Sequence, residues 1–149
     1  MTREEILAYA AGIMDGEGCI MISRSNSPNT RTGKRHMLLV EVSNTEPRML
    51  WWMKEQFGGF VNLKNSNRIR PTWKPCWAWN LRGGKAAQFL SSIAPYLQIK
   101  MPQAKLALEF YKDRGKGKPL GREGSVLQQA QYILMRELNK KGVREEVEA

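Results

Sequence analysis

Apolar and polar residues alternate in four segments of this chain, a pattern typical of half-buried β-strands. The first two segments, residues 19–25 and 35–43, flank a polar, turn-forming stretch and predict a long hairpin. Residues 60–64 and 73–81 form a second pair of the same kind and predict a second hairpin. Two successive hairpins are expected to build one antiparallel sheet.

The segments between and after the hairpins show the apolar spacing of helices. We expect helices at residues 3–14, 46–57, 85–94, 103–112 and 125–139. Thr2 is a candidate N-cap for the first helix. The order helix, hairpin, helix, hairpin, helix, followed by extra helices, predicts an α+β fold. In that fold, helices cover one face of a four-stranded antiparallel sheet, and the other face stays open.

A chain of 149 residues with 42% hydrophobic residues has the size and composition of one globular domain. We assign residues 1–142 to a single domain, with its core at about 3–112 and its C-terminal helices at about 103–140. We expect the tail at 143–149 to be frayed. No apolar run is long enough to cross a membrane, and the acidic N-terminus is unlike a secretory signal. The expected location is therefore intracellular: the cytoplasm, the nucleoid or an organelle.

The net charge of +10 is unevenly distributed along the chain. Residues 1–17 have a net charge of −3, whereas residues 18–102 have a net charge of +10. A basic middle behind a small acidic cluster suggests a polyanionic partner, with nucleic acid favoured. The alternatives are a solvated basic surface and affinity for an anionic membrane. Against a membrane, the basic residues do not gather on one amphipathic helix.

Cysteine and histidine are scarce, with two cysteines and one histidine. These numbers exclude a zinc finger, a disulfide scaffold and a histidine-rich metal site. Any metal must therefore be held mainly by oxygen, which favours a hard ion such as Mg²⁺.

Two carboxylates, Asp15 and Glu17, stand where the first helix is expected to end. Acidic side chains are disfavoured there, because the C-terminus is the negative end of the helix dipole. A divalent cation would resolve this conflict, with carboxylate and backbone carbonyl oxygens as ligands. The alternative is a glycine-rich C-cap with two solvated acids. The pattern fits neither an EF-hand nor a Walker A loop.

The segment from Ala10 to Gly18 also resembles the nine-residue signature of the LAGLIDADG homing endonucleases. Ala11, Gly12, Asp15 and Gly18 match that signature letter for letter, Ala10 replaces its leading Leu, and Glu17 replaces its second Asp. Three further phrases, at residues 42–47, 57–61 and 97–104, resemble the family in the right order. The resemblance implies an αββαββα core with a DNA-binding sheet.

The resemblance further implies a sequence-specific double-stranded DNA endonuclease, associated with introns or inteins. Only one copy of the signature is present, which in this family implies a homodimer with a pseudo-palindromic DNA target. The dimer interface would then contain Ala8, Ala11, Gly12 and Asp15, where two first helices cross. An RNA-splicing maturase with intron RNA as partner, and a nuclease-inactive DNA-binding regulator, are the alternatives on the same fold.

By the same resemblance, Glu17 is a direct metal ligand and the carbonyl of Gly16 is a second. Asn44 corresponds to the position that holds the nucleophilic water, and Arg48 and Lys100 to cations beside the scissile phosphate. Without the resemblance, Asn44 would be a turn residue and the two cations solvated bases. The expected cofactor is Mg²⁺, with Mn²⁺ substituting and Ca²⁺ supporting binding without efficient cleavage.

Expected DNA contacts lie in the hairpin loops and on one face of the strands. They are Ser23, Ser25, Arg31, Lys34, Arg35, Met37, Glu41, Asn62, Lys64, Arg68, Arg70, Lys74 and Asn80. Met37, Leu39 and Phe60 are apolar residues on this face, so either they contact thymine methyl groups or the strand register is shifted by one residue. The tryptophans are expected in the core or at a subunit interface.

Overall fold

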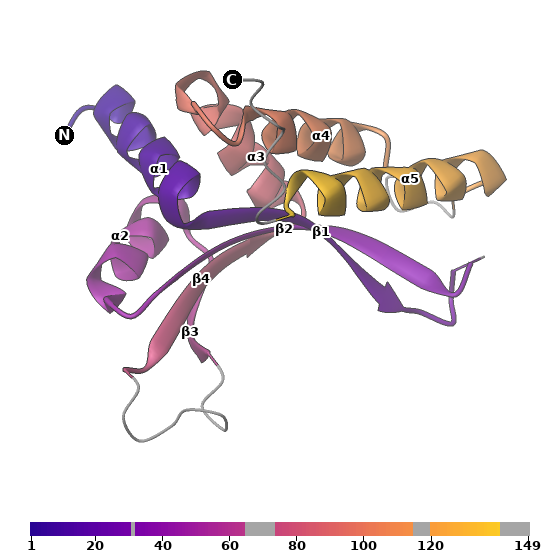
Figure 1. The fold of residues 1–149 in the computed structure, drawn as a ribbon, viewed down its shortest axis with the longest axis horizontal. Coiled ribbons are helices and arrows are strands. Elements are labelled where there is room, and N and C mark those ends of the chain that lie inside the picture. Colours follow the sequence, from indigo (N-terminus) through magenta and orange to yellow (C-terminus); the bar gives the residue numbers. More distant parts are fainter. Residues whose placement is uncertain (31, 65–73, 115–119, 141–149) are drawn as a thin grey trace, which may run out of the picture.

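The computed structural model of the chain describes residues 1–30, 32–64, 74–114 and 120–140. Within these residues the fold has five α-helices, one 3-10 turn and a four-stranded antiparallel sheet (Figure 1). The elements are α1 (Arg3–Glu17), β1 (Gly18–Asn26), β2 (Lys34–Asn44), α2 (Pro47–Phe57), β3 (Phe60–Lys64), β4 (Cys76–Arg82), α3 (Gly84–Ile93), the turn (Ala94–Tyr96), α4 (Met101–Lys112) and α5 (Arg122–Leu138). The predicted α+β class and αββαββα order are confirmed.

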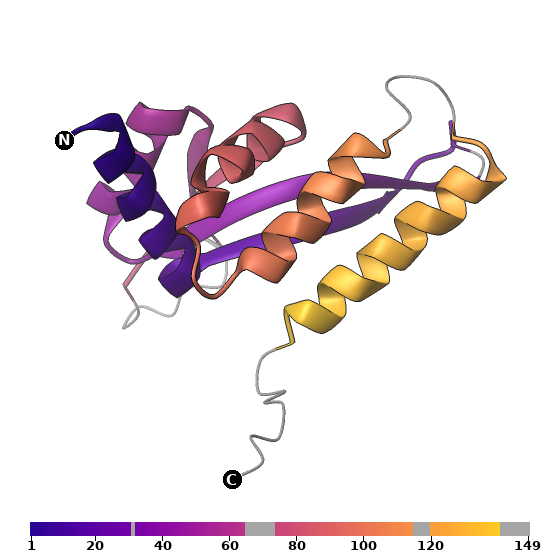
Figure 2. The ribbon, with the colours of Figure 1, turned by 90° about the horizontal axis from the view of Figure 1, so that it is seen from above.

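The sheet has the strand order β1-β2-β4-β3 and is strongly curved. The helices lie on its convex side, and no helix of the described residues covers the concave side (Figure 1). Viewed from above, α4 and α5 run side by side across β1 and β2 (Figure 2). One face of the sheet therefore builds the core, while the other is open to a large partner.

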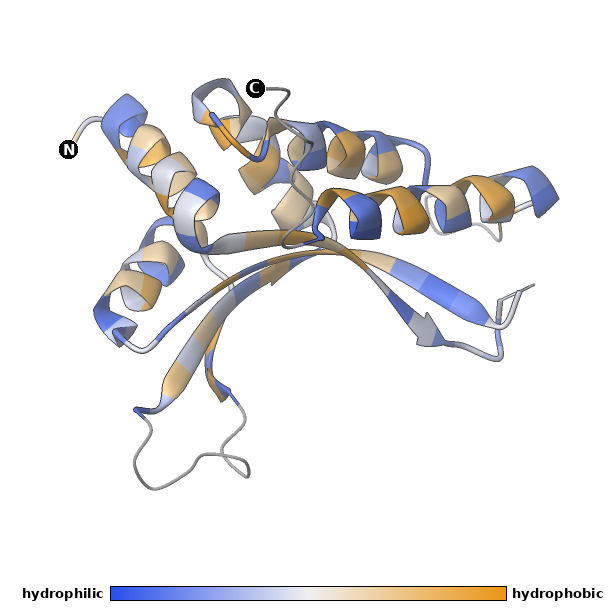
Figure 3. Ribbon diagram, in the orientation of Figure 1, coloured by the Kyte–Doolittle hydropathy of each residue, from blue (hydrophilic) through white to orange (hydrophobic). Residues whose placement is uncertain are grey.

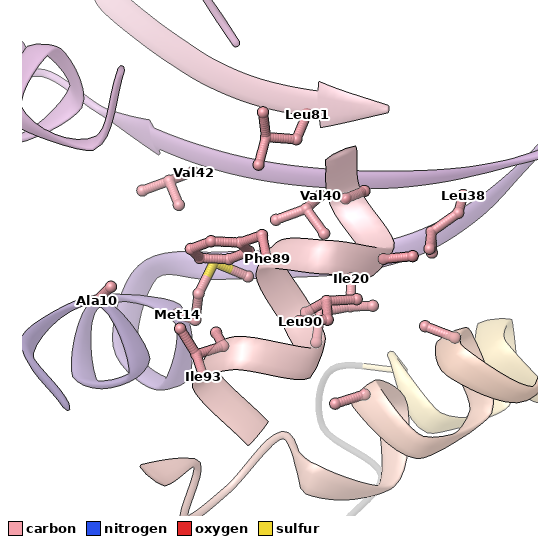
Figure 4. Packing of buried hydrophobic residues seen from close by; sticks show 14 of the residues in the cluster. Ala10, Met14, Ile20, Leu38, Val40, Val42, Leu81, Phe89, Leu90 and Ile93 are labelled. Carbon is pink, nitrogen blue, oxygen red and sulfur yellow. The ribbon is translucent and has the colours of Figure 1, made fainter. Parts of the chain in front are cut away.

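The core lies between the convex face and the helices. Met14 of α1 and Phe89 and Ile93 of α3 lie there between the helices and the strands (Figure 4). The strands are hydrophobic below the helices, whereas the far end of the β1–β2 hairpin is hydrophilic (Figure 3). The predicted inward positions of α3 are confirmed, since Ala86, Phe89, Leu90 and Ile93 are all buried.

The strand register separates core positions from open-face positions. Ile20 pairs with Val40, and both side chains are fully buried. The alternate pair, Met21 and Leu39, lies on the open face together with Phe60. The assignment of faces along the strands is therefore confirmed, and the apolar residues on the open face do not reflect a shifted register.

Three predicted boundaries are each wrong by three residues, and one of them is the start of α5, which lies at Arg122 rather than at residue 125. Helix α1 does not end at residue 14 but continues through Asp15 and Glu17, with Gly18 as its C-cap. Strand β4 begins at Cys76 rather than at residue 73. Pro75 precedes this strand and has no N–H to donate to a ladder, which explains the later start.

The tryptophans were predicted in the core or at a subunit interface, and the structure confirms the core position for Trp79. Trp79 is fully buried, and its indole N–H donates to the carbonyl of Gly58 at 2.8 Å. Trp52 and Trp77 are partly buried against the core, whereas Trp51 is 48% exposed. Trp73 lies outside the described residues. Next to the Trp79 contact, Gly59 has a φ of +91°, and a Cβ there would overlap the carbonyl oxygen of Asn80.

Within the described part of the chain, no helix combines the length and the apolar content that crossing a bilayer requires.

Candidate active site and nucleic-acid interface

The carboxylate of Asp15 binds the loop that leads into α4. Its Oδ2 accepts the backbone N–H of Gln98 at 2.8 Å, and its Oδ1 accepts those of Ile99 at 3.1 Å and Lys100 at 2.9 Å. Burial raises the pKa of Asp15, but these three backbone hydrogen bonds and the charge of Lys100 outweigh it and lower the pKa below its ordinary value. Asp15 therefore acts as an anion that ties α1 to a loop 83 to 85 residues further along the chain.

The side chain of Lys100 in turn binds the C-terminal turn of α1. Its Nζ donates to the carbonyl of Met14 at 2.9 Å and to that of Asp15 at 3.0 Å. An ammonium at the C-terminus of a helix interacts favourably with the negative end of the dipole. For Asp15, the conflict at the helix end is thus resolved inside the chain, without the divalent cation that the sequence alone suggested.

Glu17, the last residue of α1, remains exposed to solvent. The neighbouring Gly16 is also exposed, and a Cβ built on it would meet no atom within 4 Å. An exposed carboxylate beside an open peptide suits a hard cation that prefers oxygen ligands. Among the described residues, however, no group of three or more acidic, cysteine or histidine side chains could hold a metal ion. Glu17 thus stands apart from any larger cluster of such side chains among the described residues.

Asn44 is the last residue of β2, and Arg48 lies in the first turn of α2. The Asn44 Oδ1 accepts the backbone N–H of Glu46 at 2.9 Å, so Asn44 makes the turn that ends β2. The register pairs Gly18 with Val42, which places the end of β2 at the same end of the sheet as the C-terminus of α1. Asn44 is thus the turn residue that its sequence context suggests, and it lies at the same end of the sheet as the acidic end of α1.

Arg48 forms an exposed ion pair with Glu46 rather than with the acidic end of α1. Its Nε lies 2.8 Å from the Glu46 Oε1, and the Arg48 side chain is 88% exposed. The hydrogen bonds from Arg48 lower the pKa of Glu46, and the same contact raises the pKa of Arg48. The structure therefore brings Lys100 to the end of α1, whereas Arg48 is paired with Glu46. Because this ion pair is exposed and weak, a stronger anion could take the place of Glu46.

The open face gathers most of the predicted DNA-contact residues. Strand pairing places Ser23, Ser25, Arg35, Met37, Glu41, Asn62, Lys64 and Asn80 on it. Lys34, at the start of β2, donates to the side chain of Asn26, and Lys74 is exposed just before β4. Arg31, Arg68 and Arg70 lie outside the described residues. The prediction of a DNA contact at Asn80 is corrected, because this residue is only 7% exposed and has little surface to offer DNA.

An ion pair lies across the open face between β2 and β3. Lys64 Nζ is 3.0 Å from the Glu41 Oε1 and 3.3 Å from the Ser43 Oγ. The hydrogen bond with Glu41 raises the pKa of Lys64. Met21, Ser43 and the exposed Arg82 also belong to this face, although they are not among the predicted DNA contacts. Counting by two from Glu41 reaches Ser43, and from Asn80 reaches Arg82, so the alternation could have found both.

The fold buries one part of the small-residue face of α1 and leaves the other part exposed. Ala8 and Gly12 are exposed, and a Cβ on Gly12 would meet nothing within 4 Å. Ala11 is fully buried in its own chain, so its predicted place in a dimer interface is wrong. Both carboxylate oxygens of Asp15 are also occupied within the chain. The helix thus keeps a narrow exposed strip around Ala8 and Gly12.

Comparison of the sequence with models of protein families and with curated proteins finds no match. Solved structures do match. The archaeal intron-encoded homing endonuclease I-Vdi141I, complexed with DNA, has a TM-score of 0.79 at 18% identity, covering 97% of this chain and 90% of that one. The homing endonuclease I-CvuI, in complex with its target, has a TM-score of 0.76 at 20% identity, covering 93% of this chain and 84% of that one.

A third match concerns a longer protein. The LAGLIDADG homing endonuclease I-LtrWI, bound to target DNA, has a TM-score of 0.69 at 18% identity; the match covers 83% of this chain but only 42% of that one. Similarity of this extent between chains of low identity establishes a common fold. The chain thus has the fold of the LAGLIDADG homing endonucleases.

Proposed function

We propose that this protein is a homodimeric, sequence-specific DNA endonuclease of the homing type, which hydrolyses phosphodiester bonds with the help of divalent metal ions. One observation carries the proposal: the exposed carboxylate of Glu17 ends α1 in the same turn in which Lys100 binds the carbonyls of Met14 and Asp15. An acid for metal and a cation for phosphate are thus brought to one place from opposite parts of the chain.

The curved sheet supports duplex DNA as the substrate. Its open face is concave, carries exposed basic and polar side chains such as Arg35 and Asn62, and belongs to a chain of net charge +10. Antiparallel strands can enter the major groove and read base edges there. The DNA complexes of I-Vdi141I and I-CvuI are consistent with the same use of the fold in this chain.

Homodimer formation is supported by what one chain lacks. Glu17 offers a single acidic side chain, and the described residues form no larger ligand cluster. A two-fold axis along the exposed strip of Ala8 and Gly12 would bring two copies of Glu17 together. The same symmetry would give the DNA target its pseudo-palindromic form.

At this site the carboxylate of Glu17 and the carbonyl of Gly16 from each copy would hold Mg²⁺. When bound, Mg²⁺ supplies an activated water and neutralises charge on the scissile phosphate. Lys100, held on the carbonyls of Met14 and Asp15, adds positive charge where the phosphate is attacked. Arg48 contacts phosphate by leaving Glu46, since an ion pair this exposed is weak. Mn²⁺ would substitute for Mg²⁺, and Ca²⁺ would support binding with little cleavage.

Digestion of a random duplex library with Mg²⁺, followed by sequencing of the cut ends, tests this function. We expect cleavage at one pseudo-palindromic sequence and none in EDTA. DNA binding with no cut ends would contradict the nuclease and favour a DNA-binding regulator. Tighter binding of intron RNA than of duplex DNA would favour a maturase.

A further inference from the structure

Asp15 and Lys100 hold each other in a closed loop of contacts. The carboxylate of Asp15 accepts three backbone N–H groups, the last of them from Lys100 at 2.9 Å. The side chain of Lys100 then returns to α1 and donates to the carbonyls of Met14 and Asp15. The backbone of Lys100 is thus fixed by the same helix end that its ammonium binds.

We propose that Asp15 is a positioning residue for DNA cleavage, which places the ammonium of Lys100 by fixing the backbone that bears it. The inference rests on the proposed function. It assigns Asp15 a role different from metal binding and from dimer contact, because both of its oxygens accept backbone N–H groups of the loop that leads into α4.

A carboxylate suits this task better than any neutral side chain of its size. Three N–H donors from Gln98, Ile99 and Lys100 converge on it, and an ionised carboxylate offers only acceptors. The amide of Asn would keep one acceptor oxygen and turn a donor toward the remaining N–H. In Asp15→Asn the Gln98 contact or the pair of Oδ1 contacts is therefore lost, and the loop is free to shift.

A shift of this loop matters because of where Lys100 points. Its Nζ lies 2.9 and 3.0 Å from the carbonyls of the two residues immediately before Gly16. A displacement of its backbone moves the ammonium away from the acidic helix end. Misplacing a reacting group by 1 Å can cost about 100-fold in rate. The contribution of Asp15 to cleavage thus passes through Lys100.

A double-mutant cycle separates this role from simple stability. We would measure single-turnover cleavage at saturating Mg²⁺ and duplex Kd in Ca²⁺ for Asp15→Asn, Lys100→Met and the double variant. Asp15→Asn is expected to slow cleavage by about 10- to 100-fold, the range for residues that orient an active-site group. In the Lys100→Met background, the same change is expected to slow cleavage by no more than about twofold. An equal loss in both backgrounds would overturn the proposal.

Thr2→Ala is the matched control for a weakened helix. Thr2 caps the opposite end of α1, where its Oγ1 accepts the N–H of Glu5 at 3.2 Å. The variant should lower Tm while leaving the cleavage rate of the folded protein unchanged. If Thr2→Ala slows cleavage as much as Asp15→Asn does, the effect of Asp15 is one of stability alone.

Lysine labelling gives a readout that needs no cleavage. Reductive methylation followed by mass spectrometry compares Lys100, bound to two carbonyls, with Lys105, exposed on α4. Lys100 should react more slowly than Lys105 in the wild type, and this protection should be lost in Asp15→Asn but kept in Thr2→Ala. Unchanged protection in folded Asp15→Asn would contradict the proposal. If the wild type does not cut DNA, but Lys100 is protected in it and loses this protection in Asp15→Asn, the proposed function is refuted while the contact network is supported.

Should Asp15→Asn fail to fold, Gln98→Pro keeps the experiment decisive. Proline removes one of the three N–H donors at an exposed position and leaves the carboxylate in place. Faster labelling of Lys100 than in the wild type would support the proposal, and unchanged labelling would contradict it.

Discussion

Glu41 places a negative charge on the face that we expect to meet DNA phosphates, and it pairs there with Lys64. Glu41→Gln keeps the size of the side chain, removes this charge and frees Lys64. Each further phosphate contact made by a lysine steepens the salt dependence of duplex affinity by about 0.9 in the slope of log K against log salt. We therefore expect tighter binding at low salt and a steeper slope in Glu41→Gln, measured by fluorescence anisotropy.

Glu109→Gln is the control for this measurement. Glu109 is exposed on α4, which lies on the convex side of the sheet, and its replacement changes the net charge by the same amount. Its affinity and slope should follow the wild type. If both variants bind more tightly to the same degree, the gain reflects net charge and not a contact on the open face.

Also at the scale of residues, the hydrogen-bond partners of Asp15 could not be predicted from the sequence. The signature places Asp15 at a helix end, but its partners are backbone N–H groups, which leave no trace in the identity of Gln98 or Ile99. The resemblance predicts a functional cation at Lys100, whereas its contact with the end of α1 depends on the path of the chain between them. Ala11 was misplaced for a related reason, since its neighbours in the core come from distant segments.

At the scale of elements, the alternation of apolar residues predicted the strands and their faces well. It succeeded because one face of the sheet is buried, which fixes the register of pairs such as Ile20 and Val40. The end of α1 was predicted three residues early, because acidic residues and glycine there disfavour a helix locally. The compensating ammonium of Lys100 comes from 85 residues away.

The attachment of α5 to the β1–β2 hairpin should depend on pH through His36. This ring lies 3.1 Å from the Gln129 Oε1 and makes an edge contact with Tyr132. Burial lowers the pKa of His36, and the nearby charge of Arg24 lowers it further, against hydrogen bonds with Gln129 and Gln128 that raise it. Because the folded state favours the neutral ring, stability is fully present above the unfolded pKa of about 6.5 and is lost as pH falls toward the folded value.

We therefore expect the amide exchange protection of α5 to fall as pH drops below about 6.5, by more than any change in the protection of α3. His36→Gln removes the titrating group and should flatten this difference. Equal loss of protection in α3 and α5, or an unchanged profile in His36→Gln, would show that His36 does not control the attachment.

At the scale of the whole molecule, the exposed strip of α1 predicts a dimer. Gly12→Leu fills space that is open in one chain, since a Cβ there meets nothing within 4 Å. The variant should fold, with unchanged circular dichroism, but dissociate, because two crossing helices can no longer approach closely. Light scattering should give about twice the chain mass of 17.1 kDa for the wild type and a single chain for the variant.

Gln88→Leu adds the same apolar side chain to an exposed position of α3 and should remain dimeric. A wild type that cuts DNA as a monomer would contradict the dimer, whatever the variants do.

The net charge of +10 predicts that duplex affinity falls steeply with salt. In Ca²⁺, binding should persist with little cleavage, because Ca²⁺ accepts looser geometry and activates water less well than Mg²⁺. Titrating duplex affinity from 50 to 300 mM salt in Ca²⁺ checks both points. An affinity that does not change with salt would exclude the basic sheet face as the binding surface.

The most direct test of the account is cleavage of a cognate duplex by Glu17→Gln at saturating Mg²⁺. The substitution keeps the size and hydrogen-bonding capacity of the exposed side chain that ends α1, but it removes the charge that would hold the metal. We expect cleavage to fall by several orders of magnitude, as for loss of a catalytic metal. Duplex Kd should stay equal or improve, because removing acid from the DNA-facing centre reduces repulsion of phosphate. Cleavage by Glu17→Gln at the wild-type rate would show that the acidic end of α1 is only a helix terminus, and it would contradict the proposed nuclease site.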